Sequence, residues 1–119
     1  MPPTADGPRS RGTGVRVVLA TAPDQDTGET LIRTVVDERL AACGNIVPGV
    51  ASIFRWDGRV ERAAEVLLIL KTTEDVVPAL QARVAALHPY DVPEILSLAV
   101  DDGHVPYLEW VGAETGEAG

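Results

Sequence analysis

The chain has 119 residues, which is the size of one ordinary domain and too short for two hydrophobic cores. Hydrophobic residues make up 45% of it and aromatic residues only 4%, so a globular core must be built mainly from aliphatic side chains. The net charge of −8 and the pI near 4.6 argue against a nucleic-acid-binding or membrane-surface protein, because both need a basic face. The single cysteine, Cys43, cannot form an intrachain disulfide, and no signal peptide is evident, so we expect a cytoplasmic protein.

The chain opens with a segment that is unsuited to a packed structure. Residues 1–14 are rich in proline and glycine and hold no large apolar residue after Met1, which predicts a disordered tail. The β-branched run at 15–20 predicts the first strand, and Pro23 ends it. We expect the folded domain to span residues 15–112, followed by a flexible C-terminus at 113–119.

A helix is expected after the first strand. Asp24 or Asp26 can cap its N-terminus, since an aspartate oxygen accepts a hydrogen bond from an unpaired backbone N–H. We expect the helix to stop at Cys43 and Gly44, with Gly44 in the left-handed conformation that closes a last turn. The apolar residues that recur at helical spacing are Leu31, Ile32, Val35, Val36 and Leu40.

A β-hairpin is predicted next. Residues 46–56 and 60–73 read as two strands, and Asp57-Gly58 between them is a strong hairpin turn signal. Pro48-Gly49 interrupts the outgoing strand, which indicates a bend, a bulge or an edge position. The returning strand is apolar on both faces at residues 66–70, so both faces of the sheet need a cover there.

The second half of the chain predicts a helix, a strand and a short helix. Asp75 can cap a helix that carries Pro78 in its first turn and ends at His88-Pro89. Residues 94–100 then read as a strand, and residues 106–111 as a short terminal helix. The expected buried stripe of the middle helix is Val77, Leu80, Val84 and Leu87.

The order β-α-β-β-α-β predicts an α+β fold of the ferredoxin-like type, with an antiparallel sheet, both helices on one face and a short C-terminal helix. This arrangement leaves the other face of the sheet without a cover. Because the strand at 66–70 is apolar on that face too, we infer that another copy of the chain buries it.

Residues 88–94 (HPYDVPE) form a stiff loop that carries a histidine, a tyrosine and two carboxylates. His88 has two interpretations: a metal or ligand contact, or a helix-end residue that satisfies the last carbonyl groups. His104 follows Asp101 and Asp102, and two carboxylates with an imidazole are residue types that can bind a metal ion. The alternative is a solvated turn, because Asp and Gly are favoured in turns.

Three further residue types are candidates for chemistry. Cys43 is a soft ligand that suits copper, but a cysteine at a helix end is more often a small buried residue. Lys71 ends an apolar strand and could hold an anionic ligand in a cleft, with Tyr90 and Trp110 as possible lining residues. The alternative for Lys71 is a lysine whose stem covers apolar surface while its ammonium stays in water, and the alternative for the two aromatic residues is packing. No nucleophile–base or paired-carboxylate motif is present, so we do not expect an enzyme.

Six stretches together resemble the CutA divalent-cation-tolerance family, in register from about residue 15 to residue 111. The longest is ERLAACGNIVPG at 38–49, and the others are TAPD at 21–24, FRWDG at 54–58, LKTT at 70–73, HPYDVPE at 88–94 and YLEW at 107–110. The resemblance implies a homotrimer of ferredoxin-like subunits, similar to the PII signalling proteins, and no catalytic reaction.

The resemblance also implies a role in tolerance of copper and other divalent metals. Some bacterial members have a cysteine at the position of Ala20 and a histidine at that of Leu87, so only His88 remains here of that set. One imidazole per chain does not make a tight copper site, and we expect no tightly bound cofactor. The alternative is a PII-like regulatory or interaction module that binds a small molecule or a protein.

Overall fold

The computed structural model describes residues 12–117. One antiparallel sheet has the strand order β2-β3-β1-β4. The strands are β1 (Val15–Ala22), β2 (Cys43–Trp56), β3 (Arg59–Thr73) and β4 (Ile95–Ala99), and the helices are α1 (Gln25–Asp37), α2 (Val77–Leu87) and α3 (Val105–Glu114). The order β-α-β-β-α-β with a C-terminal helix confirms the predicted α+β fold. None of the helices in residues 12–117 is long and apolar enough to cross a bilayer.

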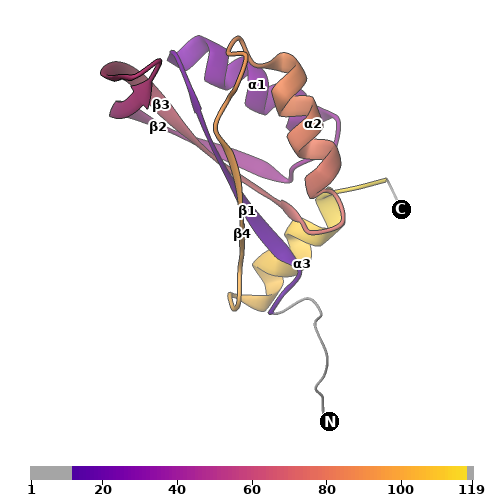
Figure 1. Cartoon of the computed structure of the whole chain (residues 1–119). Helices are drawn as coiled ribbons and strands as arrows, with labels where there is room; N and C mark the ends of the chain where they lie inside the picture. Colours follow the sequence, from indigo (N-terminus) through magenta and orange to yellow (C-terminus); the bar gives the residue numbers. More distant parts are fainter. Residues whose placement is uncertain (1–11, 118–119) are drawn as a thin grey trace.

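The sheet has one face covered by helices and one face that is largely bare (Figure 1). Helices α1 and α2 lie side by side on the covered face, where they enclose the main core. Helix α3 lies at one end of the opposite face, where Val111 packs against Val15 and Ala42. The buried residues of the main core are Val18, Ala20, Ala22, Leu31, Ile32, Val35, Ala41, Val66, Leu68, Leu70, Val77, Leu80 and Val84.

The bare face, here called the open face, is apolar. Successive side chains of a strand point to opposite faces of the sheet, so the residues of the open face alternate with the core residues along β3, β1 and β4. The register brings the open-face residues of the three strands next to one another. Leu96 and Leu98 on β4 are 54% and 50% exposed. The open face consists of Val17 and Leu19 on β1, Leu67 and Ile69 on β3, and Leu96 and Leu98 on β4. Exposed apolar surfaces of this kind are typical of sites that bind another molecule.

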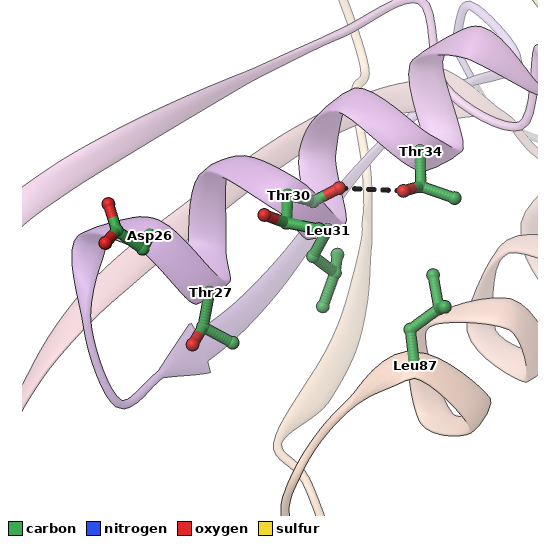
Figure 2. Close-up of a pocket in the computed structure, with 6 residues that line it drawn as sticks. All are labelled: Asp26, Thr27, Thr30, Leu31, Thr34 and Leu87. Atoms are coloured by element: carbon green, nitrogen blue, oxygen red, sulfur yellow. Dashed lines mark hydrogen bonds between the residues drawn. The ribbon is translucent and has the colours of Figure 1, made fainter.

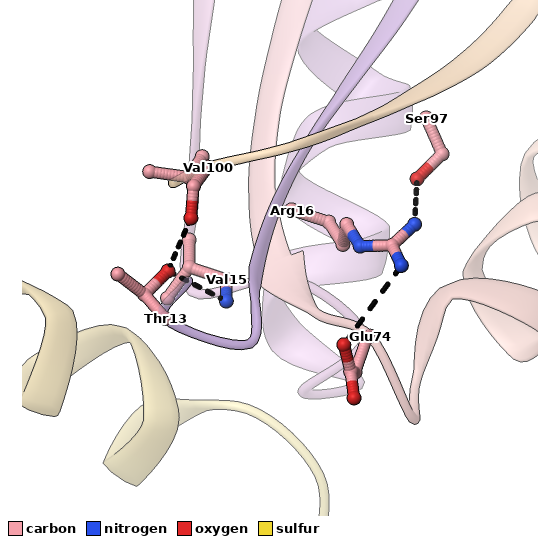
Figure 3. Close-up of polar contacts among 6 residues, drawn as sticks. All are labelled: Thr13, Val15, Arg16, Glu74, Ser97 and Val100. Atoms are coloured by element: carbon pink, nitrogen blue, oxygen red, sulfur yellow. Dashed lines mark hydrogen bonds and ion pairs between the residues drawn. The ribbon is translucent and has the colours of Figure 1, made fainter. Parts of the chain in front are cut away.

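Ordered structure begins before β1. The backbone N–H and the hydroxyl of Thr13 both donate to the carbonyl of Val100, at 3.2 and 2.8 Å, and the N–H of Val15 donates to the Thr13 hydroxyl (Figure 3). Nearby, Arg16 donates to Ser97 and lies 3.8 Å from a carboxylate oxygen of Glu74. The predicted tail at 1–14 therefore includes three residues that belong to the fold, and residues 1–11 lie outside the described residues.

Helix α1 begins as predicted and ends earlier. The Asp24 carboxylate accepts from the N–H of Thr27 at 2.8 Å, which confirms Asp24 as the N-cap and lowers the pKa of Asp24. The helix ends at Asp37, because Arg39 adopts the left-handed conformation with φ 61° and the N–H of Leu40 bonds to Val35 five residues back. The prediction that Gly44 ends the helix is wrong, since Gly44 lies in β2.

Arg39 holds this unusual conformation through contacts with the end of α3. Its guanidinium donates to the carbonyls of Ala113 and Gly116 at 2.8 and 2.9 Å, and its own carbonyl accepts from the N–H of Gly116. Thr115 is buried beside them. The chain is thus anchored through Gly116, and the predicted flexible C-terminus at 113–119 begins too early, with residues 118–119 outside the described residues.

The hairpin of β2 and β3 confirms both local predictions. The register shifts between Val47 and Val50, which places a bulge at Pro48 and Gly49. Asp57 and Gly58 both have positive φ, 53° and 76°, as a tight two-residue turn requires. Beyond the bulge, residues 50–63 form a two-stranded ribbon that projects past the helices (Figure 1), and the molecule measures 51 × 31 × 24 Å.

Helix α2 differs from the prediction at its N-terminus and ends at His88, as predicted. Its N-cap is Val76, which makes no side-chain capping bond, so the prediction that Asp75 caps it is wrong. Pro78 lies in the first turn, as predicted. Leu87 is 37% exposed and does not belong to the buried stripe that the spacing predicts. His88 is the C-cap residue, and its N–H bonds to the carbonyl of Val84.

Candidate functional site

One polar cluster lies at the end of the open face that α3 partly covers. Cys43 on β2 is directly opposite Lys71 on β3, and the Lys71 ammonium donates to the side-chain carbonyl of Asn45. The Cys43 thiol lies 3.4 Å from the hydroxyl of Tyr107 on α3. Tyr107 in turn packs against Trp110, with ring centroids 5.6 Å apart. We call Cys43, Asn45, Lys71, Tyr107 and Trp110 the end cluster.

The end cluster carries one fixed positive charge and several neutral donors. Lys71 is the only lysine of the chain, since the other nine cations are arginines. The contact with Cys43 and partial burial raise the pKa of Tyr107 to about 12, so its hydroxyl is protonated at neutral pH. Trp110 remains 42% exposed. An ammonium beside hydroxyl, amide and aromatic groups suits a small anionic ligand.

His88 lies elsewhere, and both of its ring nitrogens are engaged. It is 8% exposed. Its Nδ1 accepts from the N–H of Tyr90 at 3.1 Å, and so its Nε2 carries the proton and donates to the carbonyl of Thr21 at 2.7 Å. A metal could bind His88 only after one of these bonds breaks. The geometry therefore does not favour the predicted metal role of His88. Its imidazole makes structural hydrogen bonds, but the carbonyl that it satisfies belongs to Thr21 on β1 and not to the end of the helix, as the alternative interpretation expects.

Tyr90 belongs to a second polar group that includes a carboxylate. Its hydroxyl donates to Glu65 at 2.7 Å, and the Ser52 hydroxyl donates to the other oxygen of Glu65 at 2.5 Å. Burial, followed by the bond to Glu65, raises the pKa of Tyr90 to about 12. Glu65 and Lys71 lie six residues apart on β3, about 20 Å at strand spacing. Tyr90 is therefore not part of the end cluster, although the sequence analysis grouped it with Lys71.

His104 stands apart from both groups. It is the exposed N-cap residue of α3, and its side chain makes no capping bond. The neighbouring Asp102 carboxylate accepts from the N–H of Gly103, as in an ordinary turn. Within residues 12–117, no three side chains of His, Cys, Asp or Glu lie close enough together to hold a metal ion.

A shallow groove of about 310 Å³ lies on the covered side of the molecule, between α1 and the end of α2 (Figure 2). Its walls are mainly the threonines of α1 and Leu87 of α2, and the Thr34 hydroxyl is tied to the carbonyl of Thr30. None of the six residues predicted as metal or ligand sites lines it. The groove offers no charged group besides Asp26 and suggests no particular chemistry.

The sequence analysis did not predict three residues that make contacts in the end cluster and in the polar group around Tyr90. Tyr107 and Asn45 lie inside recognisable motifs, but only the fold places them beside Cys43 and Lys71. Glu65 had a visible signal, since it is the one carboxylate next to the apolar run at 66–70. A charge at the edge of a buried strand requires local hydrogen-bond partners, and here Ser52 and Tyr90 supply them.

The fold and the open face define a small ferredoxin-like α+β protein with an exposed apolar sheet surface, which is typical of self-associating subunits. Residues 16–114 match the family described as CutA1 divalent ion tolerance protein, and the chain belongs to this family.

A bacterial and a plant protein are similar to this chain in sequence, and a solved plant structure is similar to it in fold. The chain is 50% identical over 100 residues to the divalent-cation tolerance protein CutA of Thermus thermophilus, covering 84% of this chain and 97% of that protein. It is 45% identical over 102 residues to the chloroplastic protein CutA 1 of Oryza sativa, covering 86% of this chain and 58% of that protein. The crystal structure of CutA1 from Oryza sativa superposes with a TM-score of 0.86 at 44% identity, over 91% of this chain and 99% of that chain.

Proposed function

We propose that this chain assembles into a homotrimer through its open face and acts in the cellular response to divalent metal ions. The open apolar face carries the proposal, because the leucines that are half exposed on its edge strand β4 are buried once another copy covers them. The ribbon adds a second reason, because an isolated two-stranded ribbon is marginally stable without a partner. Three copies per assembly is the number that the resemblance to CutA proteins implies.

Native mass spectrometry with and without copper tests the assembly and the metal together. We expect three chains per particle in both conditions, because apolar contacts rather than metal bonds hold the copies together. Copper should appear as weakly held adducts that are lost in a competing chelator. A single chain in both conditions would contradict the homotrimer, and a trimer that forms only with copper would contradict its apolar origin.

For copper we propose weak binding to exposed ligands shared between copies. The sequence alone ranks His88 above His104, but the engaged nitrogens of His88 reverse the expected order. His104→Gln should therefore weaken copper binding, because it removes an exposed imidazole ligand. His88→Gln, which can still bond to Thr21, should change it little. Calorimetric titration of the two variants decides this, and a larger loss in His88→Gln would restore His88 as the principal ligand.

The end cluster favours a second candidate function, that of a PII-like module that binds a small anionic ligand. Its specific support is the only lysine of the chain, placed beside exposed aromatic and hydroxyl groups. A small anion that binds the metal-free parent, but not Lys71→Gln, would favour this candidate over the metal response.

The compartment belongs to the proposal as well. We propose the cytoplasm, where a single free thiol stays reduced. The rice relative is named as a chloroplastic protein.

A further inference from the structure

Helix α3 is held to the sheet by a small apolar contact. Among its described positions 105–114, Val111 is the one buried residue, and it packs against Val15 and Ala42. The N-terminal end of the helix has no side-chain cap, and the preceding residues 101–104 are exposed and belong to no helix or strand. An element that buries so little apolar surface opens more easily than the core of the domain.

One residue ties the C-terminal end of α3 to the rest of the chain. The Arg39 guanidinium donates to the carbonyls of Ala113 and Gly116 at 2.8 and 2.9 Å, and it lies 3.7 Å from a carboxylate oxygen of Glu114. The carbonyl of Arg39 accepts from the N–H of Gly116 at 2.8 Å. The last carbonyls of a helix have no partner inside the helix and carry partial negative charge, so a guanidinium is well suited to hold them.

This attachment has a local cost. The backbone of Arg39 is in the left-handed conformation, with φ 61°, which is unfavourable for a residue with a side chain. Thr115 is 7% exposed, and its hydroxyl has no hydrogen-bond partner within residues 12–117. A buried hydroxyl without a partner also costs free energy. The contacts of Arg39 therefore hold α3 in place against strain, which brings the closed and open positions of the helix closer in free energy.

Helix α3 carries a residue that covers the end cluster. The Tyr107 hydroxyl lies 3.4 Å from the Cys43 thiol, and Cys43 is directly opposite Lys71. Cys43 is only partly buried, and it belongs to β2 at the edge of the sheet. Movement of α3 away from the sheet would break the contact with Tyr107, and it would open the way to the Cys43 thiol and the Lys71 ammonium.

We propose that α3 is a lid over the end cluster, that residues 101–104 are its hinge, and that the contacts of Arg39 hold it closed. The inference rests on the second candidate function, the module that binds a small anion, and it names how access to that site is regulated. Lys71 supplies the charge that attracts the anion, and the opening of α3 admits the anion to it. Tyr107 and Trp110 then return with the helix and contact the bound anion.

The only cysteine of the chain reports on the opening of the lid. The reagent dithiobis(nitrobenzoate) is an anionic disulfide, and the Cys43 thiolate attacks it with release of one coloured thiolate. The rate in the folded chain, relative to the rate in the chain unfolded by urea, measures how often Cys43 is accessible. We expect the folded parent to react clearly more slowly. Equal rates would overturn the proposal, because α3 would then not cover the thiol.

Arg39→Gly tests the attachment of the lid. Glycine adopts the left-handed conformation without strain, so this variant preserves the backbone and removes the guanidinium contacts. We expect Cys43 to react roughly tenfold faster or more, because charge-assisted hydrogen bonds to the end of α3 are lost. Arg83→Gln is the matched control, since Arg83 bonds to Glu38, the neighbour of Arg39, rather than to α3. It should leave the rate unchanged.

Amide hydrogen exchange separates movement of α3 from general destabilisation. In Arg39→Gly, we expect the amides of α3 to exchange faster, while those of α2 keep the rates of the parent. Equal acceleration in both helices would overturn the lid, because Arg39 would then stabilise the whole fold. A labelling rate of Cys43 that changes with protein concentration would also overturn it, since the assembly rather than α3 would then cover the thiol.

The outcomes separate the lid from the anion site. Inorganic phosphate is the probe of the site, and it should slow the labelling of Cys43 in the parent but not in Lys71→Gln. If Arg39→Gly speeds labelling as expected and phosphate has no effect on the parent, the lid stands and the anion site is contradicted for this probe. If phosphate protects the parent and Arg39→Gly leaves the labelling rate unchanged, the lid is overturned while the anion site stands.

Discussion

Leu96→Asp is expected to leave each chain folded and to abolish its assembly. Leu96 is 54% exposed on the edge strand β4, so an aspartate there meets water in the single chain and should change the free energy of unfolding by about 0.5 kcal/mol or less. In the assembly, three unpaired carboxylates would be buried against apolar side chains, at a cost of several kcal/mol each. Size-exclusion chromatography with light scattering should report one chain per particle.

Leu87→Asp is the matched control for Leu96→Asp. Leu87 is also a partly exposed leucine, but it lies on α2, on the covered side of the sheet. The control should keep the particle mass of the parent. If Leu96→Asp keeps it too, the open face is not the surface through which the copies meet. If both variants become monomeric, the effect is one of general destabilisation and the open face loses its special role.

Leu68→Ala is expected to cause the largest loss of stability within one chain. Leu68 is fully buried at the centre of the main core, and it packs against α1 at Gly28, which has no side chain of its own to fill a void. Removal of its side chain should lower the free energy of unfolding by about 2–5 kcal/mol. Urea denaturation in the Leu96→Asp background measures this loss without a contribution from dissociation.

Leu67→Ala in the same background is the comparison for Leu68→Ala. Leu67 is the preceding residue on β3 and points to the open face, where it stays partly exposed. It should cost clearly less than Leu68→Ala in the single chain, because exposed methyl groups contribute little to folding. Equal losses would mean that the two faces of the sheet are not buried differently, contrary to the fold described above.

Local chemistry explains which elements of the fold are predictable from sequence. Asp57-Gly58 specifies the hairpin turn by its backbone preferences alone, and the Asp24 cap follows from one short hydrogen bond. The end of α1 is different, because Arg39 takes the left-handed position that glycine usually occupies. The contacts that hold it there come from Ala113 and Gly116 at the end of α3, which follow Arg39 by 74 and 77 positions in the chain. No local pattern could show this.

The candidate site was predictable in its residue types but not in its grouping. Cys43, Lys71 and Trp110 are visible as unusual residues in the sequence, and the fold brings them together through Tyr107. Their meeting depends on the register of β2 against β3, which the bulge at Pro48-Gly49 sets. Tyr90 lies in the loop between α2 and β4, which places it on Glu65 and apart from them. Side-chain identity gives the chemistry, and strand register decides which side chains meet.

Sedimentation equilibrium of the unmodified chain tests the central claim most directly, because it weighs the particle in solution without a label or a surface. One chain has a mass of 12.6 kDa. A homotrimer closed through the open face predicts a particle of three chains that persists at low micromolar concentration and in high salt, since apolar burial is insensitive to screening. A particle with the mass of one chain across the dilution series would contradict the claim.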